Sequence, residues 1–157
     1  MREIKFRALV EYEDRDKFIY PQRITFTPSV VYVYDSELDY EHQIEPKYLQ
    51  QFTGMIDMNG KEIYDGDILS FHFTDFSPDG WKDRDPAHGP FPQRQANGTV
   101  FWDERQGAWR VKGAHPGHLC DLLSGSMHYE KQPIGGTYHR TAEVIGNLYQ
   151  NPDLITP

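Results

Sequence analysis

The amino-acid sequence predicts a mainly β fold, in which an N-terminal β-meander subdomain is packed with a small C-terminal β-barrel and the chain ends in a short helical turn. Three observations support this fold class. Short runs rich in β-branched and aromatic residues recur along the 157 residues, as expected for strands. Proline, glycine and β-branched residues interrupt every window that would suit an amphipathic helix. Aromatic residues make up 14% of the chain, so a core can form although the hydrophobic fraction is only 38%.

The N-terminal part shows the signals of a strand–turn–strand meander. Within 2–9, Ile4, Phe6 and Ala8 alternate with charged residues, so the two kinds of side chain are expected on opposite faces of a strand. Further strands are predicted at 17–20, 23–27, 30–35 and 48–54. Proline and charged clusters between these runs predict the turns that connect them.

The segment 51–71, QFTGMIDMNGKEIYDGDILSF, predicts two chain reversals. Asn59-Gly60 lies between two apolar runs, and this dipeptide is a strong hairpin signal because both residues tolerate a positive φ. A second reversal is predicted at 65–67 (DGD), followed by a strand over 68–73. The expected core face of that strand carries Leu69, Phe71 and Phe73.

The second half of the chain alternates between a long irregular segment and clear strand signals. Residues 74–97 contain four prolines and two glycines with little periodicity, which predicts a long loop. Strands are predicted at 98–104 and 108–112, joined by a turn at 105–107, and at 142–149, whereas 113–141 is left unassigned. Asn-Pro at the start of 151–157 predicts a terminal helical turn, because it places a capping residue before a proline at the first helical position.

These elements suit one domain over 1–157 with three parts. The predicted parts are an N-terminal β subdomain at 1–53, a barrel at 54–150 with a long insertion loop at 74–97, and the terminal turn at 151–157. The barrel is predicted from the order of its parts, namely glycine-led strands that are separated by tight turns.

The charge of the chain disfavours binding to a nucleic-acid backbone. The formal net charge is −8 and the pI is near 5.3, whereas such binders rely on clustered lysine and arginine. The stretch 35–45 holds five acids and neither lysine nor arginine. It is interpreted as a solvated loop or short exposed helix; the alternative is an acidic patch that meets a basic partner or imitates nucleic acid.

The cysteine content and the distribution of apolar residues indicate the cellular compartment of the protein. Cys120 is the single cysteine, so no internal disulfide can form, which fits a reducing cytoplasm. No apolar run approaches the roughly 18 residues of a membrane span, and charges interrupt the first residues where a secretory signal would be apolar. We therefore expect a cytoplasmic protein with no membrane partner.

Two patterns suggest metal ligands without matching an established site. Asp75, Ser77 and Asp79 have the opening spacing of a calcium loop, but its twelfth position is a proline. His115-x-x-His118-x-Cys120 fits none of the defined zinc spacings. Neither pattern supports a metal or cofactor, and none is expected.

Catalytic signals are equally weak. The acid pairs Asp65/Asp67 and Asp103/Glu104 offer groups for acid–base chemistry, but in a β-rich chain such pairs more often mark turns. The chain lacks the G-x-S-x-G elbow and the glycine-rich phosphate loops. No catalytic residues are predicted, and the chain is not expected to be an enzyme.

Two sets of residues are candidates for binding. Phe76, Trp81 and Phe91 lie in the polar loop, where they either pin the loop to the barrel or anchor a partner protein. The second set would serve direct nucleic-acid binding through a basic stripe and a stacking face; it consists of Lys61, Trp102, Arg105, Trp109, Arg110 and Lys112.

Three landmarks in order give the sequence a family resemblance. They are the start MREIKFRA, the central QFTGMIDMNGKEIYDGDILSF and the ending EVIGNLYQNPDLI, with GTVFWDE between the last two. On these motifs the sequence resembles the YopX family, small proteins encoded by phages and prophages of bacteria. It departs from the family pattern at Met55 and Met58, where leucine and lysine are usual, and in its longer loop at 74–97.

The resemblance implies a mostly β protein whose C-terminal part is an SH3-like barrel, and a bacterial host cell as its location. It brings no catalytic residues, because the family has no established biochemical activity. We therefore predict a phage or prophage accessory protein that acts as a non-catalytic interaction module for a host or phage protein. The alternatives are a nucleic-acid-associated protein, by direct binding or by acidic mimicry, and a cryptic enzyme or metal-binding protein.

Overall fold

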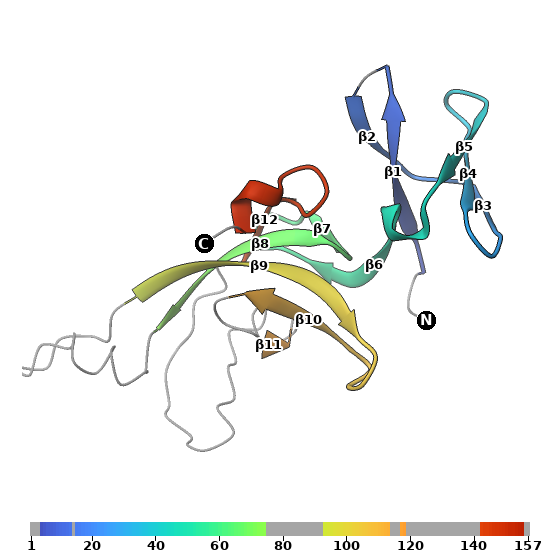
Figure 1. The fold of residues 1–157 in the computed structure, drawn as a ribbon. Coiled ribbons are helices and arrows are strands. Elements are labelled where there is room, and N and C mark those ends of the chain that lie inside the picture. Colours follow the sequence, from blue (N-terminus) through green and yellow to red (C-terminus); the bar gives the residue numbers. More distant parts are fainter. Residues whose placement is uncertain (1–3, 14, 75–92, 114–116, 119–141, 156–157) are drawn as a thin grey trace, which may run out of the picture. The chain divides into compact units, whose positions relative to one another are not determined.

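The computed structural model describes residues 4–13, 15–74, 93–113, 117–118 and 142–155, and the following refers to these alone. They form β-strands with two short 3-10 turns (Figure 1). The strands are β1 (Phe6–Tyr12), β2 (Arg15–Ile19), β3 (Arg23–Phe26), β4 (Val31–Asp35), β5 (Tyr40–Ile44), β6 (Leu49–Ile56), β7 (Glu62–Tyr64), β8 (Asp67–Thr74), β9 (Gln93–Asp103), β10 (Ala108–Gly113), β11 (Gly117–His118) and β12 (Glu143–Asn147). The 3-10 turns are η1 (Pro46–Tyr48) and η2 (Pro152–Ile155). The mainly β fold class and the terminal helical turn are thus confirmed.

The chain divides into two compact units. The first comprises Met1–Met55 and Glu62–Gly66, and the second comprises Ile56–Lys61 and Asp67–Pro157. The stem of the β6–β7 hairpin therefore belongs to the first unit and its tip to the second. The subdomain boundary expected between 53 and 54 stays a prediction.

The first unit contains a four-stranded sheet of order β2-β1-β6-β7 and a three-stranded sheet of order β3-β4-β5. Buried and partly exposed residues alternate along β4, so every second side chain of this strand faces the core of the unit. Side chains from both sheets form one apolar cluster, which excludes water from their facing sides. The cluster consists of Ala8, Val10, Ile19, Val31, Val33 and Ile44.

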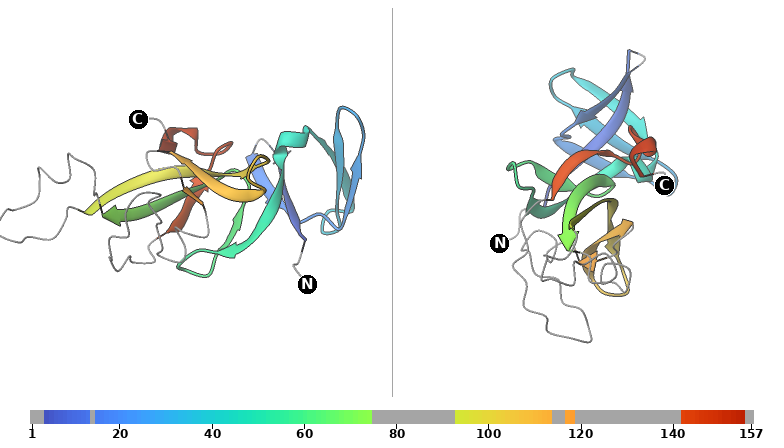
Figure 2. Two further views of the ribbon diagram at one scale, coloured as in Figure 1. Left: turned by 90° about the horizontal axis from the view of Figure 1, so that it is seen from below. Right: turned by 90° about the vertical axis from the view of Figure 1, so that its left-hand side faces the viewer.

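The second unit is a five-stranded antiparallel sheet of order β11-β10-β9-β8-β12. Its long strands β8 and β9 lie side by side and curve together (Figures 1 and 2). A bulge between Val144 and Gly146 shifts the register of β12 against β8. One face carries buried apolar residues, namely Leu69, Phe71, Ala96, Val100, Trp109 and Val111. That this sheet belongs to an SH3-like barrel stays a prediction.

Both predicted reversals of the central segment are present. Gly60 and Gly66 have φ of 82° and 78°, a region that glycine enters without steric cost. Asn59 keeps a negative φ, so only the glycine of the Asn-Gly pair uses the left-handed region. The turn at 105–107 is confirmed as well, with Gly107 at φ 59°.

Two expectations about local structure were wrong. The acidic stretch 35–45 is neither loop nor helix over its second half, because Tyr40–Ile44 pairs with β4. The loop expected at 74–97 is shorter, since β9 begins at Gln93 and its first residues pair with the end of β8. In both cases a distant strand supplies the contacts that weak local propensity does not. The core face expected for the strand at 68–73 is confirmed at Leu69 and Phe71, and Ile68 and Ser70 on the other face are buried as well.

No helix among the described residues is long and apolar enough to cross a membrane.

Candidate functional site

The central motif is held by the carboxylate of Asp57. This side chain is only 5% exposed. Its Oδ1 accepts hydrogen bonds from the backbone N–H groups of Asn59 and Lys61, both at 2.8 Å. Its Oδ2 accepts a third from the N–H of Val144, at 2.9 Å. One carboxylate therefore closes the hairpin turn and fastens it to β12, so all the hydrogen bonds that the structure shows for it are structural.

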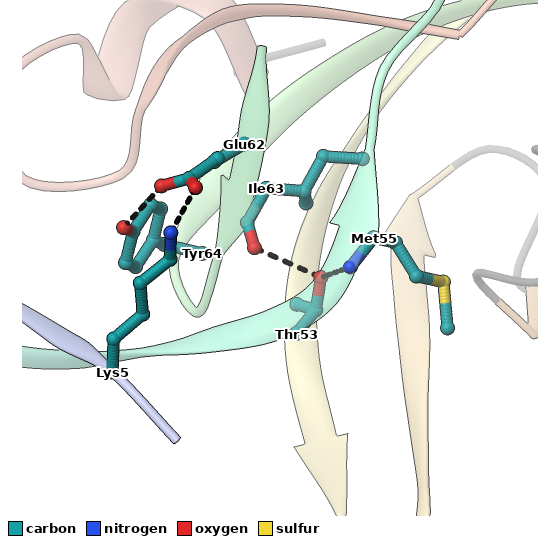
Figure 3. A network of polar contacts seen from close by, with 6 residues as sticks. All are labelled: Lys5, Thr53, Met55, Glu62, Ile63 and Tyr64. Atoms are coloured by element: carbon teal, nitrogen blue, oxygen red, sulfur yellow. Dashed lines mark hydrogen bonds and ion pairs between the residues drawn. The ribbon is translucent and has the colours of Figure 1, made fainter. Parts of the chain in front are cut away.

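A second polar network lies where β7 meets the start of the chain. Lys5 Nζ and the Tyr64 hydroxyl both point to the carboxylate of Glu62 (Figure 3). The Tyr64 hydroxyl donates to Glu62 Oε2 at 2.7 Å. The hydrogen bond from Lys5 lowers the pKa of Glu62, and burial raises the pKa of Tyr64. Tyr64 is therefore a neutral donor at physiological pH rather than a nucleophile or base.

Arg7 is buried on the same face of this sheet, at 5% exposure. Its guanidinium carbon lies 4.0 Å from the ring centroid of Phe18 and 4.4 Å from that of Tyr64. Its Nε donates to Gln50 Oε1 at 2.9 Å. Two rings and an amide thus surround the charge, and the arrangement fixes strands β1, β2, β6 and β7 relative to one another.

The acid pairs singled out in the sequence mark strand ends. Asp67 is buried at the start of β8 and accepts from Asn147 Nδ2 at 3.3 Å. Asp103 ends β9, where Arg110 lies 3.2 Å from its Oδ2. Desolvation opposes ionisation of Asp103, but hydrogen bonds from Arg110 and from the backbone of the following turn lower its pKa. Both carboxylates are engaged in structural contacts.

The residues predicted for nucleic-acid binding are split between two faces. Trp102 and Trp109 are direct cross-strand partners, so both leave the face that also carries the buried core. They meet edge to face at 5.2 Å between ring centroids. Arg110 and Lys112 leave the opposite face, because side chains alternate along β10. Trp109 is buried, which removes it as a stacking surface.

The remaining two members of that set are in turns. Lys61 is exposed at the tip of the β6–β7 hairpin, and Arg105 is exposed in the turn between β9 and β10. Arg110 is already paired with Asp103. The structure thus brings together the two tryptophans but places no basic side chain of the set on their face of the sheet.

The other candidate residues lie outside the described part of the chain. These are Phe76, Trp81 and Phe91 of the partner-binding set and Asp75, Ser77, Asp79, His115 and Cys120 of the metal patterns. Within the described residues, no group of three or more His, Cys, Asp or Glu is arranged to hold a metal ion.

Sequence reasoning offered the surface of the β4–β5 hairpin only as an acidic patch and did not single out its apolar residues. Leu38 is 37% exposed and Tyr40 is 59% exposed, and the flanking acids Glu37 and Asp39 are exposed too. Asp39 accepts a hydrogen bond from a tyrosine hydroxyl, but no described lysine or arginine pairs with either acid. The signal for this surface was the concentration of acids in 35–45. The stretch was interpreted as a loop or short helix, so the strand at Tyr40–Ile44 was not predicted.

Beneath this surface two buried polar atoms lack a hydrogen-bond partner among the described residues. They are Asp35 Oδ2 and His42 Nε2. Asp35 is 4% exposed and His42 is 8% exposed. The other oxygen of Asp35 accepts from the N–H of Glu37 at 2.9 Å, so only one side of the carboxylate is used.

The fold and its polar networks define a class of protein made of two antiparallel β units, with a central motif that sets backbone geometry. The sequence matches the family described as YopX protein over residues 5–156, so the chain belongs to the YopX family. A crystal structure of protein EF1440 from Enterococcus faecalis is similar over 99% of this chain and 100% of that one, with 18% identity and a TM-score of 0.52. This likeness shows a shared fold. A search of curated proteins gave no match.

Proposed function

We propose that this chain is an accessory protein of phage or prophage origin that acts in the bacterial cytoplasm as a non-catalytic module for binding another protein. The observation that carries the proposal is the β4–β5 hairpin. It presents exposed Leu38 and Tyr40, which alternate in sequence with the exposed acids Glu37 and Asp39. Apolar and aromatic side chains ringed by charge are typical of protein interfaces.

The chemistry of the conspicuous polar residues supports binding rather than turnover. Asp57, Glu62 and Asp67 each accept hydrogen bonds that hold strands or turns together. A carboxylate held in this way is set to maintain geometry, whereas a general acid or base must reach a substrate proton. The net charge of −8 further favours a basic partner surface, through electrostatic steering.

Affinity capture from host lysate, with and without nuclease, tests the proposal. The wild-type protein is compared with Leu38→Ser and with the control Ile155→Ser, because Leu38 and Ile155 are similarly exposed, at 37% and 36%. We expect a protein that is retained despite nuclease and is lost with Leu38→Ser only. An empty column, or equal loss with both variants, would contradict the proposal.

Acidic mimicry of nucleic acid is the second candidate, favoured by the exposed acids Glu37 and Asp39, with which no described lysine or arginine pairs. In this case the captured protein is a nucleic-acid-binding one, and duplex DNA displaces it from the column. Retention that disappears after nuclease treatment points instead to direct association with nucleic acid, with a steep salt dependence. These outcomes distinguish three kinds of partner: a protein that does not bind nucleic acid, a nucleic-acid-binding protein, and nucleic acid itself.

A further inference from the structure

We propose that the end of the β4–β5 hairpin is a binding site for an arginine side chain of a basic partner protein. This proposal deepens the binding function above and rests on it. The site consists of Asp35 Oδ2, His42 Nε2 and the ring of Tyr40. The exposed acid Glu37 follows Asp35 by two residues.

Strand pairing places the three side chains together. Asp35 is the direct cross-strand partner of Tyr40, and His42 is the direct partner of Val33. Direct partners leave the same face of an antiparallel pair, and positions two residues apart on one strand share a face. Asp35, Tyr40 and His42 therefore form a contiguous group on the face that carries the apolar core. The rings of Tyr40 and His42 are in contact, edge to face at 4.8 Å.

The burial of this group points to a missing partner. A buried carboxylate oxygen without a hydrogen bond is costly, because desolvation is not compensated. Asp35 Oδ2 and His42 Nε2 are both in this situation, and their residues occupy diagonal positions on one face of the hairpin. Tyr40, by contrast, is 59% exposed. The exposed ring of Tyr40 is therefore the side from which an arriving group enters the proposed site.

The chemistry of the two atoms selects the occupant. Oδ2 of an ionised aspartate accepts only, and an imidazole nitrogen without a proton also accepts. An arginine guanidinium supplies several N–H donors in one plane and stacks on aromatic rings, so one group can satisfy both acceptors and pack on Tyr40. A lysine ammonium has a single donor centre and lacks the planar surface.

The surrounding charges favour the same occupant. Glu37 is exposed and has no lysine or arginine partner among the described residues. Asp39 is exposed too, but its Oδ1 accepts from the hydroxyl of Tyr34, which leaves the opposite face. Glu41 is compensated, because Arg23 lies 3.2 Å from it. The side chains of Arg23 and Glu41 project from the opposite face of the sheet. The pair therefore does not neutralise the negative electrostatic potential at the site.

The test is an NMR titration of the full-length protein with the peptide acetyl-Gly-Gly-Arg-Gly-Gly-amide. The same peptide with lysine or citrulline in place of arginine serves as a comparison. We expect shifts confined to the amides of 35–42, and an affinity at least fivefold higher for arginine than for lysine. Asp35→Asn should weaken arginine binding by about tenfold, the effect of losing one charged hydrogen bond.

Two further variants control for charge and folding. Glu104→Gln removes the same unit of charge from the turn after β9 and should leave binding unchanged. Tyr40→Ala alters an exposed side chain and should reduce binding without unfolding the protein.

Equal losses with Asp35→Asn and Glu104→Gln, equal affinity for the arginine and lysine peptides, or no binding would each overturn the arginine site. The capture experiment is independent of this outcome. A partner lost with Leu38→Ser while the arginine peptide fails to bind leaves the interaction function standing and removes only the site. If the capture fails but the arginine peptide binds, the site stands and the proposed protein-binding function is removed.

Discussion

Asp57 and Val144 are 87 residues apart in sequence, yet the carboxylate of Asp57 accepts a hydrogen bond from the backbone N–H of Val144 at 2.9 Å. The same side chain accepts from Asn59 and Lys61. Turn formation and the attachment of the last strand thus depend on one buried group.

Replacing Asp57 with alanine should therefore destabilise the protein strongly. Three backbone donors lose their acceptor, and we expect a loss of about 2–4 kcal/mol in the free energy of unfolding. Chemical denaturation measures it. The neighbouring Met58→Ala is the control, because Met58 is 55% exposed, and it should change stability by less than about 0.5 kcal/mol. Similar effects of the two variants would argue against the structural role of the carboxylate.

The Lys5–Glu62–Tyr64 network predicts a pH dependence of stability. The hydrogen bond from Lys5 lowers the pKa of Glu62 below its ordinary value of 4.5. The stabilisation is therefore present above pH 4.5, the ordinary value for this group, and is lost as the pH falls through the lower pKa of the folded state. Wild type should be more stable than Glu62→Gln at pH 7, and the difference should shrink below pH 4.5. Urea denaturation of both proteins across this range measures the difference, and a constant gap would contradict the assignment.

Arg7 should not be replaceable by lysine. Its guanidinium contacts two rings and donates to Gln50, and an ammonium cannot reproduce the planar stacking. We expect Arg7→Lys to cost about 2 kcal/mol of stability. Arg15→Lys, at an exposed position of β2, should be nearly neutral. Thermal unfolding of the two variants tests this prediction. If both variants unfold at the same temperature, the buried stack contributes little to stability.

Gly113 should not tolerate a side chain. A Cβ at this position would lie 2.4 Å from the carbonyl oxygen of Asn97 and 2.9 Å from the Cα of Gly98. Both atoms belong to the backbone of β9, so relief requires the two strands to separate. Gly113→Ala should destabilise the protein by about 2 kcal/mol or more, whereas Thr99→Ala in the facing strand should cost less. A Gly113→Ala protein as stable as wild type would show that the strands separate at little cost.

Some features were predictable because their causes are local. The turn at Asn59-Gly60 follows from the freedom of glycine at positive φ. The alternation of Ile4, Phe6 and Ala8 with charged residues correctly predicted a strand, β1, but it did not predict its burial, because Ile4 is 71% exposed and Arg7 is buried. The candidate site was harder to predict from the sequence. The acids of 35–45 were recognised as a possible patch, but the strand at 40–44 was not predicted.

The sequence by itself determined the fold class, the reversals and the family, because turn chemistry and residue alternation act over a few residues. Only the tertiary structure decided that 40–44 is a strand, that Arg7 is buried between rings, and that Asp35 lies beside Tyr40 and His42. Those features arise from pairing between separate segments. Hydrogen bonds and burial supplied by another strand outweigh the weak preferences of any single stretch of chain.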